Sequence, residues 1–152
     1  MADQRNGESE ARDAKVVVGV DGSETSLAAL RWAGNQSSWM GVPLEVVTAW
    51  DFPEHPAPLG VEVKVPWPDE LMAQASVRLE QIVSEVLRED QRRAVRAKVV
   101  RGSAVPVLLA ESRRATLLVV GSRGRSLLQG VLLGSVSERC VRHAECPVLV
   151  VR

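Results

Sequence analysis

The chain has 152 residues, a formal net charge of +0 at pH 7 and an apolar fraction of 45%. This length suits one domain with one hydrophobic core. The balanced charge excludes the broad positive field that draws proteins to nucleic acid or to an anionic membrane, so we expect neither partner. The start of the chain lacks the apolar stretch of a signal peptide, and no apolar run reaches the length of a membrane span. We therefore expect a soluble, cytoplasmic protein.

The two cysteines do not predict a disulfide or a metal site. Cys140 falls in a helical pattern and Cys146 precedes a proline, and the two form no Cys-x-x-Cys pair. His143 lies near Cys146, but two candidate ligands are fewer than the four of a structural zinc site. We expect no bound metal there.

The first half of the chain begins with a polar segment and then alternates strand and helix patterns. Residues 1–14 are polar and without periodicity, which predicts a disordered tail ahead of one domain over residues 15–152. The β-branched run at 15–21 predicts a buried parallel strand. Ser23 is the expected N-cap of a helix that ends before Gly41, and residues 44–50 predict a second strand.

A proline-rich segment, residues 51–68, separates this half from the next and predicts a long loop. Such a loop is either a plain surface connection or a binding loop, and the sequence leaves both open. Asp69 begins a helix whose apolar residues follow helical spacing up to Val86. The remaining patterns predict strands at 94–100, 115–121 and 146–152 and helices at 102–114 and 135–143.

Alternating strands and helices predict an α/β fold with a parallel sheet covered by helices on both faces. Right-handed crossovers lead to an open five-stranded sheet of order 3-2-1-4-5. Strands 1 and 4 then meet where the order reverses. Their carboxyl ends, Asp21 and Gly121, frame the crevice in which such sheets bind ligands.

The glycines that follow the fourth strand predict a backbone that can surround an anion. Gly121 would let a ligand approach the backbone, and Gly124 would adopt a positive φ that a Cβ disfavours. Several N–H groups can then point inward as an anion nest. Gly134 precedes the last helix, whose first N–H groups have no partner within the helix.

Side chains of the same segment fit this reading. The Ser135 and Ser137 hydroxyls can add hydrogen bonds, and Arg123 and Arg125 can add positive charge. Together these features predict an anion site, most economically one for a phosphate chain. The alternative is an ordinary connection with turn glycines.

The spacing Gly121-x2-Gly124-x9-Gly134-Ser135 resembles the G-2x-G-9x-G-S/T motif of the universal stress protein family, in its ATP-binding branch. The opening stretch VVVGVDGSETSLAALRWA and the closing CPVLVVR are similar to the two ends of that family's domain. The resemblance covers residues 15–152. It implies a Rossmann-like fold of the adenine nucleotide alpha hydrolase type.

The resemblance also implies a set of binding residues. Asp21 would contact the nucleoside or a metal-bound water, unless it only caps the first helix, and Ala49 would line an adenine pocket. Trp50 would either stack on the base or pack in the protein, and Thr48 stands where many relatives have histidine. The residues that would hold the triphosphate and ribose are Gly121, Arg123, Gly124, Gly134, Ser135, Val136 and Ser137.

The function implied is a stress-response regulator that binds ATP, with Mg²⁺ as an accompanying ion, and changes its conformation or partner. Three alternatives stay open: a slow ATP hydrolase, a module for AMP or cyclic AMP, and a nucleotide-free dimeric interaction protein. Neither His55 nor His143 is clearly aimed at a γ-phosphate, so we expect weak turnover at most. The edge strand at residues 147–152 predicts a homodimer, as relatives commonly form.

Overall fold

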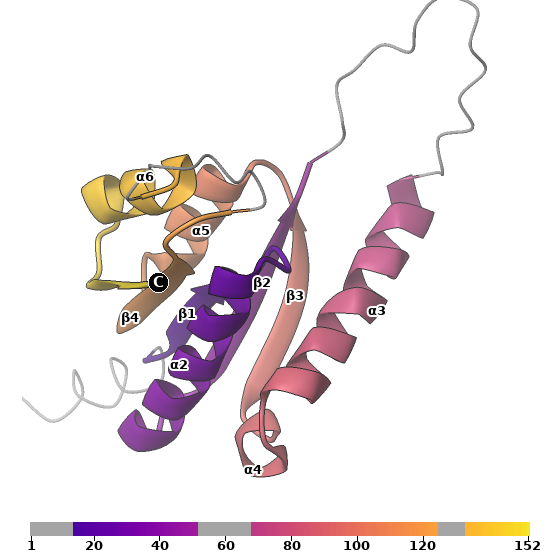
Figure 1. Ribbon diagram of the computed structural model, residues 1–152, viewed down its shortest axis with the longest axis horizontal. Coiled ribbons are helices and arrows are strands. Elements are labelled where there is room, and N and C mark those ends of the chain that lie inside the picture. Colours follow the sequence, from indigo (N-terminus) through magenta and orange to yellow (C-terminus); the bar gives the residue numbers. More distant parts are fainter. Residues whose placement is uncertain (1–13, 52–67, 125–132) are drawn as a thin grey trace, which may run out of the picture.

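The computed structural model describes residues 14–51, 68–124 and 133–152. The expected tail up to residue 13, nearly all of the proline-rich loop, and Arg125 lie outside these ranges. In chain order the elements are β1 (Val16–Gly19), α2 (Glu24–Met40), β2 (Leu44–Trp50), α3 (Pro68–Val86), α4 (Glu89–Arg92), β3 (Val95–Arg101), α5 (Ala104–Ser112), β4 (Leu117–Gly121), α6 (Ser135–His143) and β5 (Val148–Val151) (Figure 1).

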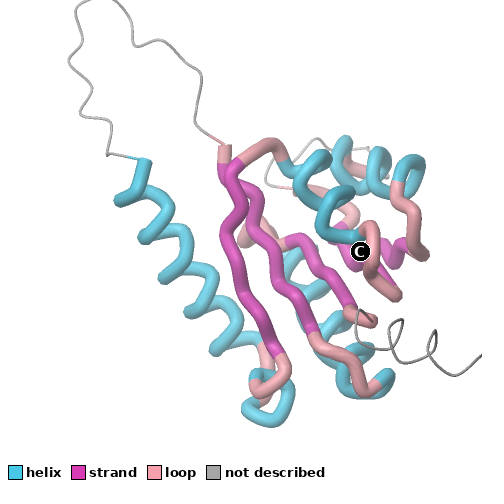
Figure 2. The backbone as a smooth tube through the Cα atoms, turned by 180° about the vertical axis from the view of Figure 1, so that it is seen from behind, coloured by secondary structure: helices cyan, strands magenta, loops and turns pink. Residues whose placement is uncertain are grey.

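The predicted sheet is confirmed. Its strands are parallel and follow the order β3-β2-β1-β4-β5. Val16 of β1 pairs with Leu44 of β2 on one side and Leu117 of β4 on the other. Figure 2 shows the strands side by side between helices. Because the order reverses between β1 and β4, the carboxyl ends of these strands lie together.

Each face of the sheet has its own apolar core. Val16 and Val18 of β1 face the core under α2 and α3, while Val17 between them faces the core under α5 and α6. The alternation follows from the period of two residues in a strand. A central strand buried on both faces therefore reads as a continuous apolar run, as VVV does here.

Local signals set the helix ends. Ser23 is the N-cap of α2 and its Oγ accepts from the Ser26 N–H at 3.4 Å, as predicted. Gly41 ends the helix in the left-handed region with φ of 65°. Ser103 is the N-cap residue of α5, but its hydroxyl donates to Asp51 Oδ2 at 2.9 Å instead of bonding the helix. No helix in the described ranges has the length and apolar character to cross a membrane.

A buried carboxylate links β2 with β3, α5 and the residue that precedes β1. Glu45 of β2 is 7% exposed and accepts from Lys15 Nζ at 2.8 Å. Lys98 of β3 contacts its other oxygen and also donates to Glu111 of α5 at 2.6 Å. Burial alone would raise the pKa of Glu45, but the hydrogen bonds and charges of the two lysines outweigh it and lower the pKa from 4.5 to about 2.

We predict that Glu45 makes stability depend on acidity. A carboxyl whose pKa is lower in the folded state stabilises above its unfolded value near 4.5, and this contribution is lost as pH falls toward about 2. Glu45→Gln should therefore lower the free energy of unfolding at pH 7 by roughly 2–3 kcal/mol and lessen its decline in acid. Urea unfolding of both proteins at several pH values between 2.5 and 7 measures this. Parallel pH profiles would contradict it.

Candidate functional site

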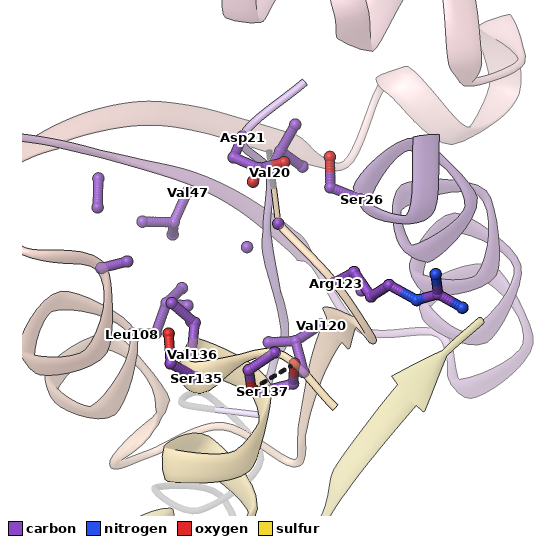
Figure 3. Close-up of a pocket in the computed structure, with 16 residues that line it drawn as sticks. Val20, Asp21, Ser26, Val47, Leu108, Val120, Arg123, Ser135, Val136 and Ser137 are labelled. Carbon is purple, nitrogen blue, oxygen red and sulfur yellow. Dashed lines mark hydrogen bonds between the residues drawn. The ribbon is translucent and has the colours of Figure 1, made fainter. Parts of the chain in front are cut away.

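A cavity of about 400 Å³ opens at the carboxyl ends of β1 and β4, where the strand order reverses. This main cavity contains all nine residues that the sequence singled out for a site. Its described walls come from β1, α2, β2, α5, β4 and α6 (Figure 3). They consist of Gly19, Val20, Asp21, Ser26, Val47, Ala49, Ala104, Leu108, Val120, Gly121, Arg123, Gly124, Gly134, Ser135, Val136 and Ser137.

The main cavity combines an apolar wall with a polar one. Val47 and Leu108 belong to the apolar core on the α5 face of the sheet, and Ala49 packs against the same core. Val136 of α6 lies close to Leu108 (Figure 3). Asp21 lies on the opposite side of the view, at the end of β1. Small-molecule sites commonly combine apolar walls with a few oriented polar groups in this way.

Asp21 organises the turn between β1 and α2. Its Oδ1 accepts from the Ser23 N–H at 2.9 Å and from the Ser23 hydroxyl at 2.5 Å. Ser23 in turn caps the helix, so Asp21 supports the cap without being the cap itself. A Cβ placed on Gly124 would lie 3.2 Å from Asp21 Oδ2, so this second oxygen faces the backbone that follows β4.

The predicted positive φ of Gly124 is wrong. Among the described glycines the positive-φ residues are Gly22, Gly41 and Gly102. Gly124 instead lies beside the Asp21 carboxylate, and a side chain there would have to move it. A glycine is required at this position because the Asp21 carboxylate lies close to it, and not because the backbone adopts a positive φ. The spacing of glycines in the sequence cannot distinguish these two reasons.

Gly121 has a different reason to lack a side chain. A Cβ there would lie 2.8 Å from the backbone N of Ser26 and 2.7 Å from Thr25 Oγ1. The end of β4 therefore packs directly on the first turn of α2. The sequence reading ascribed this glycine to ligand approach, whereas the contact that excludes a Cβ comes from the protein itself.

Ser122 connects the start of α6 to the sheet, and sequence reasoning missed it. Its N–H donates to the Val151 carbonyl of β5 at 2.6 Å, and its own carbonyl accepts from the Gly134 N–H at 2.6 Å. The Ser137 hydroxyl also donates to that carbonyl, at 3.0 Å. Ser137 thus uses its one hydroxyl proton to hold α6 in place. A serine between two motif residues carries no spacing signal of this role.

The first turn of α6 presents backbone donors to the main cavity. Gly134 is the N-cap, and the first N–H that bonds within the helix is that of Glu138, which donates to the Gly134 carbonyl at 2.9 Å. The N–H groups of Ser135, Val136 and Ser137 precede this bond and have no acceptor within the helix. All three residues line the cavity. A helix start of this kind favours a negatively charged group.

Arg123 reaches the site mainly through its backbone. Its carbonyl accepts from Thr25 Oγ1 at 2.6 Å, a second contact that the sequence did not suggest. The guanidinium extends away from Ser135 and Val136 (Figure 3). The predicted contribution of its charge therefore has no support in this geometry.

A second cavity, of about 460 Å³, lies between α3 and the ends of β1 and β2 and shares Val20, Asp21 and Ala49 with the main cavity. Trp50 lines this second cavity and is not among the residues of the first. Thr48 also lines it, with its hydroxyl donating to the Val20 carbonyl at 2.8 Å.

Other candidate chemical groups lie away from the main cavity. His143 ends α6, at the opposite end from Ser135, and His55 lies outside the described residues. Burial raises the pKa of the Cys140 thiol to about 11, which makes it a poor nucleophile. Within the described ranges no three His, Cys, Asp or Glu side chains gather in a metal-binding cluster.

Comparisons with known proteins identify relatives over nearly the whole chain. The model of the universal stress protein family matches residues 14–152. A universal stress protein of Mycobacterium tuberculosis is 34% identical over 143 residues, which cover 90% of this chain and 47% of the relative. The chain thus spans about half the length of the curated relatives it matches.

Solved structures agree with the fold. A universal stress protein in complex with cAMP is 29% identical, with a TM-score of 0.60 over 91% of this chain and 96% of that one. A universal stress protein from Archaeoglobus fulgidus in complex with dAMP has a TM-score of 0.62 over 91% of this chain and 98% of that one. Because the two sequences are only 20% identical, this match supports the shared fold alone. The family match, the parallel sheet and the spacing of its glycines lead to one conclusion: the chain belongs to the universal stress protein family.

Proposed function

We propose that this protein binds an adenine nucleotide in the main cavity and that the nucleotide is ATP, whose binding regulates the protein's conformation or partners. The observation that carries the proposal is the cavity itself, which lies at the reversal of strand order and is lined by the first turn of α6, whose N–H groups have no acceptor within the helix. The cAMP complex of a relative with 29% identity supports an adenine nucleotide.

The proposed phosphate position is the first turn of α6. The N–H groups of Ser135, Val136 and Ser137 and the positive end of the helix dipole would bind phosphate oxygens. The Ser135 hydroxyl would add a donor. Ser122 and Ser137 hold this turn against the sheet, so its donors are oriented before a ligand arrives.

The proposed base position is the apolar wall formed by Val47, Ala49 and Leu108. An adenine ring there would be removed from water at a site that is largely preformed. Asp21 Oδ2 would accept from a ribose hydroxyl or help to hold Mg²⁺ near the phosphates. Because Asp21 is negative, bare phosphate oxygens are expected nearer to α6 than to β1.

A regulatory role is favoured over catalysis by the groups available. Among the described residues that line the main cavity, Asp21 is the one carboxylate, and no histidine is present. Asp21 Oδ1 already accepts two hydrogen bonds from Ser23. Activating a water for attack on a γ-phosphate needs a positioned base, so turnover should be slow.

We also propose that the protein is a homodimer paired through β5, which lies at the edge of the sheet. An edge strand presents unpaired N–H and C=O groups that a second copy can satisfy across a two-fold axis. The cytoplasmic location expected from the sequence stays a prediction, as does the absence of nucleic acid and membrane partners.

We predict that nucleotide affinity depends on the start of α6. Gly134→Val should weaken ATP binding by tenfold or more, roughly 1.4 kcal/mol, because its Cβ would lie 3.4 Å from backbone atoms of Ser122 and Arg123 and its branches would displace the start of α6 that presents the donors. Ser135→Ala should cost less, on the order of 1 kcal/mol, through loss of one hydroxyl. Isothermal titration with ATP, ADP and cyclic AMP measures this, with Ser84→Ala on the exposed side of α3 as the control.

Wild-type affinity for ATP in Gly134→Val would contradict the proposed phosphate position. Binding of cyclic AMP in preference to ATP would support the nucleotide site but contradict ATP as its ligand. If no nucleotide binds the wild type, the interaction-protein alternative is favoured.

We further predict that Gly121 and Gly124 differ in what they affect. Gly121→Ala should destabilise the fold by roughly 2 kcal/mol, because its Cβ would meet backbone atoms of α2. Among the described residues, a Cβ in Gly124→Ala would meet the Asp21 carboxylate, which can shift, so this variant should alter ATP affinity more than stability. Urea unfolding and titration of both variants separate the two effects. Equal losses of stability would show that the two glycines have the same role.

Catalysis is predicted to be weak. With ATP and Mg²⁺, the purified protein should turn over at least a hundredfold below the ~10 per second of ordinary enzymes. A coupled phosphate-release assay measures this rate. A rate near that of ordinary enzymes, abolished by Ser135→Ala, would favour the hydrolase alternative.

A further inference from the structure

The short length of β5 limits what strand pairing alone can contribute to a dimer. The Leu118 N–H donates to the Pro147 carbonyl at 3.0 Å and the Ser122 N–H to the Val151 carbonyl at 2.6 Å, so these two carbonyls face β4. By alternation, the backbone groups of Val148 and Val150 face outward. A stable dimer buries on the order of 1,200–2,000 Å². A strand of four residues needs additional surface beside it to reach that area.

Helix α6 exposes an apolar residue on its β5 side. Ser137 marks that side, because its hydroxyl bonds Ser122, whose N–H bonds the end of β5. Val141 lies four residues later and therefore on the same side of the helix. Its exposed fraction is 50%, although it is apolar.

Helix α2, on the other face of the sheet, also exposes an apolar residue on the side that faces β5. Thr25 bonds the Arg123 carbonyl just beyond β4, and Trp32 lies two turns later on the same side. The opposite side of α2 faces α4: Gly34 follows Trp32 by two residues, about half a turn around the helix, and a Cβ placed on Gly34 would lie 3.3 Å from Gln91 Nε2 of α4. Trp32 is therefore turned away from α4, and its exposed fraction is 50%.

The level of Trp32 along the helix matches that of β5. Gly121 of β4 contacts Thr25, and Gly121 pairs with Val151, so Thr25 marks the carboxyl end of β5. At about 1.5 Å per helical residue, Trp32 lies about 10 Å from that end, within the roughly 13 Å length of the strand. Trp39, which is 85% exposed, lies about 21 Å away, beyond the strand.

We propose that Trp32 and Val141 form two apolar seams beside paired β5 strands, each in contact with the same helix of a second copy of this chain. An antiparallel pair about a two-fold axis perpendicular to the sheet brings the two α2 helices together on one face and the two α6 helices on the other. The seams supply the area that four strand residues lack. This inference rests on the dimer given under the proposed function.

The test compares dimer dissociation constants by sedimentation velocity. Trp32→Glu and Val141→Glu should each raise the constant by about tenfold or more, because they remove apolar contact and set like charges near the two-fold axis. Val150→Pro should also raise it, since it removes an outward N–H while leaving the bonds to β4. The matched control is Val77→Glu on α3, which is 56% exposed and should leave the constant within about twofold.

The outcomes separate the inference from the dimer on which it rests. A dimer weakened by Val150→Pro but unchanged by Trp32→Glu and Val141→Glu overturns the seams and keeps β5 pairing. A wild-type monomer at micromolar concentrations, or a dimer unaffected by all three substitutions, overturns both. If circular dichroism shows either glutamate variant to be unfolded, Trp32→Gln and Val141→Thr decide by the same criterion.

Discussion

The close packing of β4 on the first turn of α2 is the constraint on which the site depends. Gly121 meets the backbone of Ser26 without room for a Cβ. This contact brings the end of β4 beside the end of β1. The residues that follow β4 then pass close to Asp21. Ser122 then ties the same segment to both β5 and α6 through backbone hydrogen bonds. The main cavity therefore lies between parts of the chain that are mutually fixed.

That arrangement explains why a site with few charges is suited to an anionic ligand. Fixed N–H groups at a helix start need no reorganisation when a negative group arrives, and an apolar wall reduces competition from water. Arg123 directs its charge elsewhere, so the proposed affinity rests on backbone donors (Figure 3). A site of this kind can hold a nucleotide firmly without the base and positioned water that hydrolysis needs, which agrees with the proposed regulatory role.

Sequence reasoning predicted the sheet order because alternation of elements and crossover handedness leave few topologies. The nine residues that it proposed for a site line one cavity, since parallel strands end at the same edge. The sequence did not predict a residue's role where that role depends on a tertiary contact. Gly124 lacks a Cβ because of Asp21, and the roles of Ser122 and Thr25 depend on residues about thirty and one hundred positions away. The charge on Glu45 inside β2 likewise depends on Lys15, which precedes β1, and on Lys98 of β3.

The central claim is that backbone N–H groups at the start of α6 bind the phosphates of an adenine nucleotide. Amide chemical shifts in a ¹H–¹⁵N correlation spectrum, recorded during titration with ATP and Mg²⁺, test it most directly. The account predicts that the largest shifts belong to Ser135, Val136 and Ser137, with smaller shifts at Asp21 and Ala49. Saturable shifts confined to other parts of the chain, or no shifts at millimolar ATP, would contradict it.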